Sequence, residues 1–264
     1  MNKPSSFAEL RAVTQPDEVR SRANAEHWTA SLYLRDISPY LTWVLLRTPI
    51  SANGVTGLMI LVGWSVAFAL LIPGIWGPVL AVLLGQLQML VDCSDGEVAR
   101  WRKTSSPAGV FLDKVGHYTT EALIPLALGL RAAGFGTQAE LDYFWTTLGG
   151  VLAVIIVLNK ALNDMVHVAR ANAGLPKLAD SKEAKAVRPG VVAKLRSLAR
   201  FLPFHRLYHS VELSLIAFGF AIIGLWIGQV EATQWMVAIL TPVSLLALLG
   251  HFVAIMSSSR VRPA

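Results

Sequence analysis

Ionisable residues interrupt the otherwise apolar stretch 91–120 at spacings that suit chemistry. Asp92 and Asp95 lie three residues apart at the end of one apolar run. Asp113 and His117 lie four residues apart at the start of the next run. Residues three or four apart share one face of a helix. Because ionisable groups in apolar helices are costly unless they pair, bind ions or line a wet cavity, these four side chains are candidates for a functional site.

The four side chains also match in depth, if the two helices meet the membrane surface near positions 101 and 107. Asp95 and Asp113 then lie six residues inside. Asp92 and His117 lie nine and ten residues inside. At about 1.5 Å per residue, these depths are roughly 9 Å and 14 Å, so an antiparallel hairpin would bring three carboxylates and an imidazole together. Anionic oxygen donors suit a hard divalent cation, and the sequence therefore predicts a Mg²⁺ or Mn²⁺ site with these four residues as ligands.

A long gapped pattern runs through the same stretch: Asp92-x2-Asp95-Gly96-x2-Ala99-Arg100-x8-Gly109-x3-Asp113-x3-His117. It resembles the signature of the CDP-alcohol phosphotransferase (CDP-alcohol phosphatidyltransferase) family, D-x2-D-G-x2-A-R-x8-9-G-x3-D-x3-D. Seven of the eight fixed positions match, and the last family Asp is replaced by His117. A pattern of this length and spacing is highly specific.

The resemblance implies a metal-dependent transferase of lipid metabolism. Such an enzyme moves a substituted phosphate from a CDP-linked donor, here expected to be CDP-diacylglycerol, to a small alcohol or phosphorylated-alcohol acceptor and releases CMP. It also implies a homodimer and places Asp113 and His117 in the catalytic step. The residues that it implies for nucleotide binding are Asn53, Thr56, Asp95, Gly96, Ala99, Arg100 and Gly109.

His117 leaves three alternatives for the reaction. The family Asp at this position is thought to activate the acceptor hydroxyl, and an imidazole, with an ordinary pKa of about 6.5, can take up that proton near neutral pH. Glu121, one turn further along the same face, is the alternative base. In the third alternative activity is lost, and the protein only binds CDP or lipid.

Polar residues of the later apolar runs are candidates for acceptor binding: Lys160, Asp164, His167, Arg170 and His209. Lys160 and Arg170, with the basic segment 172–206, favour an anionic acceptor. The alternative is that the segment's charge reflects membrane topology and that Lys160 only neutralises Asp164. His251 is interpreted as an interhelical hydrogen-bond partner rather than a ligand.

Composition predicts an all-α integral membrane protein. The 264 residues are 54% hydrophobic and only 15% charged, with a mean hydropathy of +0.52. We expect an N-terminal cytoplasmic or interfacial helical segment (1–52), a catalytic membrane domain (53–258) and a short tail (259–264). Six transmembrane helices are predicted at about 53–72, 76–100, 107–130, 144–171, 207–228 and 233–256. The single cysteine, Cys93, is expected to pack rather than react.

The N-terminal segment is predicted to form amphipathic and juxtamembrane helices. Ser6 and Glu9 have the spacing of a capping box, and a second helix is expected at about 16–34. Residues 38–47 form a short amphipathic stretch that is expected to lie in the membrane interface.

Basic residues predict the orientation in the membrane. The segments before 53, at 101–106, at 172–206 and after 257 hold 18 Lys and Arg residues, whereas the opposite connections hold only Arg131. The positive-inside rule places both termini and the motif hairpin in the cytoplasm, in a plasma or inner membrane. The net charge of +6 is therefore assigned to topology and to membrane lipids rather than to nucleic acid.

Besides a protein that only binds CDP or lipid, two other functions stay open. A transferase of this kind can use a water-soluble CDP-alcohol as the donor. A small transporter is suggested only by polar residues among six helices, and no discontinuous helices in matched halves support it.

Overall fold

The computed structural model describes residues 3–20, 28–137, 140–176, 208–258 and 260–261, and most of the basic segment 172–206 lies outside these ranges. The described residues form helices and connecting turns without a β-strand. In chain order the helices are α1 (Phe7–Thr14), α2 (Asp17–Arg20), the π-helix η1 (Ala30–Leu34), α3 (Arg35–Leu45), α4 (Ala52–Leu70), α5 (Trp76–Arg102), α6 (Pro107–Ala132), α7 (Tyr143–Asn172), α9 (Ser210–Ile227) and α10 (Gln229–Met256).

The six longest helices follow the six predicted spans closely. Five of them, α4, α5, α7, α9 and α10, are long and apolar enough to cross a membrane. The sixth, α6, has 26 residues and the length to do so, but it carries the ionisable residues of the motif and Arg131. It contacts α4, α7, α9 and α10, so other helices cover much of its polar surface. The all-α membrane fold is confirmed, and six spans are consistent with it.

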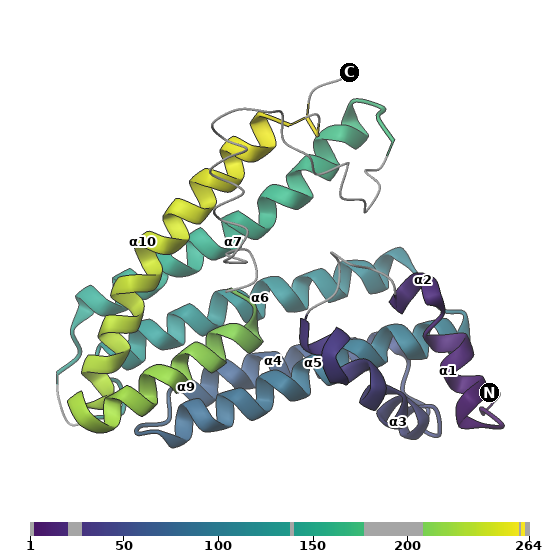
Figure 1. Ribbon diagram of the computed structural model, residues 1–264, viewed down its shortest axis with the longest axis horizontal. Coiled ribbons are helices and arrows are strands. Elements are labelled where there is room, and N and C mark those ends of the chain that lie inside the picture. The colour runs from purple at the N-terminus through teal and green to yellow at the C-terminus, as the bar shows by residue number, and fades with distance from the viewer. Residues whose placement is uncertain (1–2, 21–27, 138–139, 177–207, 259, 262–264) are drawn as a thin grey trace.

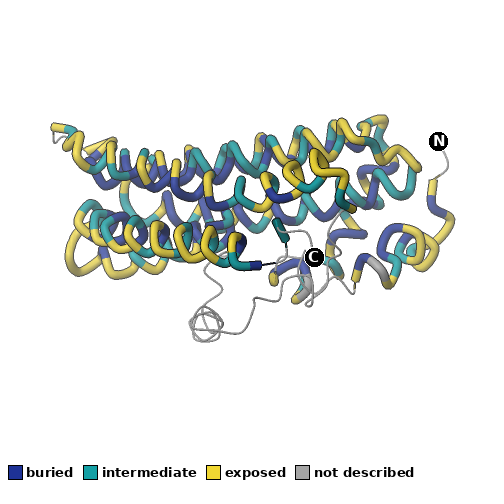
Figure 2. The backbone as a smooth tube through the Cα atoms, turned by 90° about the horizontal axis from the view of Figure 1, so that it is seen from above, coloured by how far each residue is buried: buried dark blue, intermediate teal, exposed yellow. Residues whose placement is uncertain are grey.

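The outer faces of the long helices are apolar. Leu83, Val154 and Leu246 are 63%, 65% and 70% exposed, respectively. Figure 2 shows such exposed positions along the outside of the bundle, with buried positions between the helices. Apolar side chains cover the outside because the surrounding solvent of this region is lipid rather than water. The chain is an integral membrane protein.

The helices form one bundle from which α7 and α10 diverge (Figure 1). α4, α5, α6 and α9 lie together, and α1 to α3 pack at the end of α5 where the chain passes to α6. The main apolar core joins α4, α5, α6, α7, α9 and α10, with Leu70, Leu128 and Met236 almost fully buried in it. At the end of the bundle away from α1, buried Arg131 donates hydrogen bonds to the carbonyls of Ile72 and Gly74.

A single glycine separates the last two helices. The sequence suggested a gap at about 229–232, but α10 begins at Gln229. Gly228 has φ +99°, a conformation that glycine alone adopts without strain, so one residue is enough to reverse the chain.

The N-terminal segment is helical, with boundaries that differ from the prediction. Ser6 caps α1 by accepting the Glu9 N–H, although Glu9 reaches back to Ser5 rather than to Ser6. The expected helix at 16–34 is described as α2 and η1, and residues 21–27 lie outside the description.

Helix α3 begins at Arg35, three residues before the predicted start of the amphipathic stretch, and it includes Pro39. Proline cannot donate to the carbonyl four residues earlier. Gln15 Nε2 donates to that carbonyl, on Arg35, at 2.6 Å. A tertiary hydrogen bond therefore allows α3 to start upstream of its proline.

We predict that the α6–α7 crossing tolerates no side chain at Gly149. A Cβ there would lie 2.5 Å from Gly129 Cα, whereas a Cβ at neighbouring Gly150 would meet only Leu126, at 4.0 Å. Gly149→Ala should lower the free energy of unfolding in detergent by about 1–3 kcal/mol because the helices must separate. Gly150→Ala is the matched control and should be neutral or slightly stabilising. Equal unfolding midpoints for the two variants would contradict this packing.

Candidate active site and metal centre

A tight hairpin between α5 and α6 brings the two halves of the motif together. α5 ends at Arg102, the next residue Lys103 has φ 55°, and the Thr104 N–H donates to the Ala99 carbonyl. Ser106 then caps α6 by accepting the Gly109 N–H at 3.2 Å, and Pro107 occupies the first helical turn. These are ordinary stop and start signals, and they set the register of α5 against α6.

Three of the four predicted ligands meet across this hairpin. His117 Nε2 lies 3.1 Å from Asp92 Oδ1 and 3.4 Å from Asp113 Oδ1. One ligand atom from each of the three residues falls within 4.8 Å of the others. The side chains are 22–40% exposed, so the cluster is open to solvent on one side.

This donor set fits a divalent cation. Two carboxylates and one imidazole nitrogen converge from two helices at separations that one ion can span. The oxygen donors suit Mg²⁺, and the nitrogen shifts the preference toward Mn²⁺ or a later transition metal. Asp92, Asp113 and His117 are thus able to hold the ion.

Asp95 has a different partner. Its Oδ2 accepts a hydrogen bond from Thr56 Oγ1 at 2.7 Å, which links α5 to α4. Thr56 is almost fully buried, and its hydroxyl also lies 3.2 Å from the Ala52 carbonyl. Asp95 is not one of the three residues whose ligand atoms lie within 4.8 Å of one another, and its place as a fourth ligand stays a prediction.

The residues predicted for nucleotide binding lie around the same hairpin. A Cβ on Gly109 would come within 3.2 Å of Asn53 Oδ1, so glycine allows α6 to approach the start of α4. Arg100 folds back along α5, where a Cβ on Gly96 would lie 3.1 Å from its guanidinium. Ala99 is partly buried against the apolar cluster near the turn.

A buried acid lies one turn beyond His117. Glu121 is 3% exposed, and its Oε1 accepts from Lys160 Nζ of α7 at 2.5 Å. The same oxygen lies 2.9 Å from His209 Nδ1, at the start of α9. Two of the predicted acceptor residues, Lys160 and His209, thus converge on Glu121, the alternative base.

Asp164 belongs to another cluster, and the suggested pairing of Lys160 with Asp164 is wrong. Lys114 Nζ lies 2.7 and 2.8 Å from the two carboxylate oxygens of Asp164 and forms an ion pair with them. The Tyr118 hydroxyl donates to Asp164 Oδ2 at 3.0 Å. Lys114 and Tyr118 were not singled out from sequence. Their signal was present, since both lie one residue beyond a motif position and share a face of α6.

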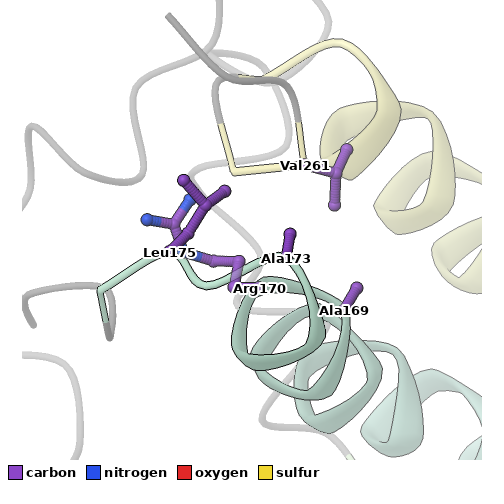
Figure 3. A pocket seen from close by; sticks show the side chains of 5 residues that line it. All are labelled: Ala169, Arg170, Ala173, Leu175 and Val261. Atoms are coloured by element: carbon purple, nitrogen blue, oxygen red, sulfur yellow. The ribbon is translucent and has the colours of Figure 1, made fainter.

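The other predicted acceptor residues are not gathered with this group. His167 is exposed on α7. Arg170 lies ten residues beyond Lys160, about 15 Å along the helix, where it donates to the carbonyls of Pro176 and Arg260. A small hollow at the ends of α7 and α10 is lined by Ala169, Arg170, Ala173, Leu175 and Val261 (Figure 3).

Two predictions about single residues agree with the structure. His251 Nδ1 lies 2.8 Å from Asn159 Oδ1 of α7, as expected for an interhelical partner. Cys93 is buried in an apolar cluster with Met89 and Val211.

We predict that the Glu121–Lys160 pair matters far more to stability than the Lys114–Asp164 pair. Lys160→Met would leave a buried carboxylate with His209 alone and should lower the free energy of unfolding by about 3 kcal/mol. Lys114→Met is the matched control, because that lysine side chain is 50% exposed and an exposed pair contributes less than about 1 kcal/mol. Thermal unfolding of both variants in the same detergent measures the difference, and a larger loss for Lys114→Met would refute it.

Comparison with known proteins identifies a family match. A family model described as CDP-alcohol phosphatidyltransferase matches residues 49–204. The match begins just before α4 and includes the whole motif hairpin and α7. A search of curated proteins gives no match.

Proposed function

The chain belongs to the CDP-alcohol phosphatidyltransferase family of membrane transferases, and we propose that it transfers phosphatidyl from CDP-diacylglycerol to a small alcohol or phosphorylated alcohol. The observation that carries the proposal is the convergence of Asp92, Asp113 and His117 across the hairpin, beside the Asp95–Thr56 pair. Oxygen of the acceptor hydroxyl attacks the lipid-bearing phosphorus. The phosphorus–oxygen bond to CMP breaks, CMP leaves with the electron pair, and the hydroxyl proton passes to a base.

The metal that we propose is Mg²⁺ or Mn²⁺, held by Asp92 and Asp113, with Asp95 next to them. His117 is left to act as the base, because a ring nitrogen that binds the ion could not also take up the proton. A bound divalent ion supplies charge neutralisation to the diphosphate and so makes CMP a better leaving group. Asp95 accepts a hydrogen bond from Thr56 at one carboxylate oxygen, and we propose that its other oxygen contacts the ion or the substrate.

The cytidine end of the donor is proposed to bind where α4, α5 and α6 approach one another. Gly96 lets the Arg100 guanidinium lie close to the backbone of α5, and Gly109 does the same for the Asn53 amide at α6, so both polar groups border the proposed site. Arg100 contributes a positive charge for phosphate from the end of α5.

Of the two candidate bases, contacts favour His117. Glu121 Oε1 already accepts from Lys160 and lies 2.9 Å from His209 Nδ1, and these neighbours stabilise the ionised carboxylate against taking up a proton. His117 lies among the carboxylates at the cluster itself. The acceptor would approach from the side of Lys160 and His209.

Cytoplasmic orientation of the site is part of the proposal. In a Cys93→Ser background, a cysteine at exposed Thr104 in the hairpin turn should react with a membrane-impermeant maleimide only after the cells are opened. A cysteine at exposed Glu140, in the connection from α6 to α7, should react in intact cells. The reverse labelling pattern would overturn the orientation.

The central prediction is metal-dependent release of CMP. Purified full-length protein is supplied with CDP-diacylglycerol, pooled acceptors (glycerol 3-phosphate, inositol, inositol phosphate and serine) and Mg²⁺ or Mn²⁺. Asp95→Asn and Asp113→Asn should each lower the rate by about 100-fold or more, because a negative charge at the site is removed. Glu231→Gln, in the first turn of α10, is the control and should retain the rate.

Variants of His117 separate the alternatives. A loss of about 100-fold or more in His117→Ala, with metal binding retained, would identify the imidazole as the base. No release with any acceptor, while CDP binds in the presence of metal, would reject the proposed donor. Activity restored by His117→Asp would then show that the natural site binds without turnover, and activity with a soluble CDP-alcohol would identify the alternative donor.

A further inference from the structure

Glu97 is a fully buried acid within the motif that the reaction does not use. It lies two residues after Asp95 and three before Arg100, on a different face of α5 from Asp95. Its carboxylate accepts three hydrogen bonds, each from the N-terminal segment. The donors are Gln15 Nε2 at 2.8 Å, Ser38 Oγ at 2.5 Å and Thr42 Oγ1 at 2.7 Å.

The donors are themselves buried and held in place. Ser38 and Thr42 of α3 are 0% exposed, and Gln15 at the end of α1 is 6% exposed. Gln15 Nε2 also donates to the Arg35 carbonyl, and Arg35 Nη1 lies 3.8 Å from Glu97 Oε1. The single carboxylate of Glu97 therefore joins α1, α3 and α5.

In a second polar link the donor is on α5 and the acceptor is in the N-terminal segment. Arg100 Nε donates to the carbonyl of Thr14, at the end of α1, at 2.6 Å. The guanidinium of Arg100 is thereby held beside Gly96 rather than extended into solvent. The N-terminal segment thus fixes the motif arginine directly as well as through Glu97.

Apolar contacts support the same attachment. Leu10 of α1 is 0% exposed and belongs to one cluster with Val98 of α5 and Val55 of α4. Further along, Tyr33 donates to Gln86 of α5, and Trp28 donates to Glu212 of α9 at 2.6 Å. The attachment therefore extends over several turns of α5.

We propose that the described part of the N-terminal segment, residues 3–20 and 28–47, is a positioning element of the nucleotide site, acting through Glu97 and Arg100. It lies outside the part of the chain that the family model matches, residues 49–204. The inference rests on the proposed function only for the identity of the nucleotide. Gln15, Ser38 and Thr42 are positioning residues, because they act on α5 through Glu97, and Glu97 is one because its carboxylate is bonded to the N-terminal segment.

Because the Glu97 carboxylate is buried, all of its hydrogen-bond donors must be present. An ionised carboxylate in a protein interior needs a full set of donors, and losing one leaves a lone pair without a partner. α5 can then restore a partner only by turning or by admitting water. Because Asp95, Gly96 and Arg100 lie within one turn of Glu97 on the same helix, either change displaces the groups that are proposed to hold the nucleotide.

The test measures CDP binding by full-length protein in the presence of Mn²⁺. Thr42→Val removes one donor to Glu97 at nearly constant volume, and Thr42→Ser retains the hydroxyl. Thr42→Val should weaken CDP binding about three- to tenfold, and Thr42→Ser should bind within about twofold of the wild type. Gln15→Leu should weaken binding like Thr42→Val. In turnover, the KM for the CDP-linked donor should rise by the same factor while kcat stays within about twofold.

Asp36→Ala is the matched control within the N-terminal segment. It removes the exposed ion pairs of Asp36 with Arg11 and Arg20 and leaves Glu97 untouched. CDP binding by Asp36→Ala should equal that of the wild type.

Two results would overturn the inference. One is unchanged CDP affinity in both Thr42→Val and Gln15→Leu, even if their unfolding midpoints fall, because that is the result of a purely structural role. The other is a wild type that binds no CDP at all. Binding of CDP without any CMP release would reject the proposed function and leave the positioning inference testable by affinity alone.

Discussion

Carboxylates inside a membrane protein need hydrogen-bond donors or cations as partners, and the arrangement of this bundle depends on providing those partners. α5 and α6 carry five carboxylates, those of Asp92, Asp95, Glu97, Asp113 and Glu121. Four of them have a polar partner on another element: Asp92 has His117, Asp95 has Thr56, Glu97 has the N-terminal segment, and Glu121 has Lys160 and His209. Asp113 lies beside His117 of its own helix. An unpaired buried charge is so costly that these partners dictate which helices must be neighbours.

The partners divide the motif hairpin into regions with different tasks. Asp92, Asp113 and His117 remain partly exposed, and they are close enough to share an ion. Glu97 and Glu121 are buried and already hydrogen-bonded, so they hold helices together. Exposure and partner number separate the carboxylates that are available to a ligand from those that stabilise the bundle.

Helices outside the motif hairpin therefore contribute to the site through contacts with buried acids. α7 supplies Lys160 to Glu121, and the turn before α9 supplies His209 to the same oxygen. The N-terminal segment supplies three donors to Glu97 and a carbonyl to Arg100. The acceptor side and the nucleotide side of the proposed site are thus stabilised by separate elements, one after the motif in sequence and one before it.

The sequence by itself determined the membrane class, the long helices and the meeting of Asp92, Asp113 and His117. Apolar runs and helical spacing are local properties, and a short hairpin between two such helices leaves little freedom in register. Only the tertiary structure decided the partners of Glu97, Lys160 and Asp164, because these contacts join residues 39 to 82 positions apart or distinguish neighbouring charges on one helix. The sequence suggested that Lys160 pairs with Asp164, because the two residues lie four positions apart on α7. Residues on one helix also compete for partners on a neighbouring helix, and where α6 crosses α7 the partner of Lys160 is Glu121. The hydrogen bond from Gln15 to the Arg35 carbonyl, which replaces the one that Pro39 cannot make, is likewise a contact that only the tertiary structure shows.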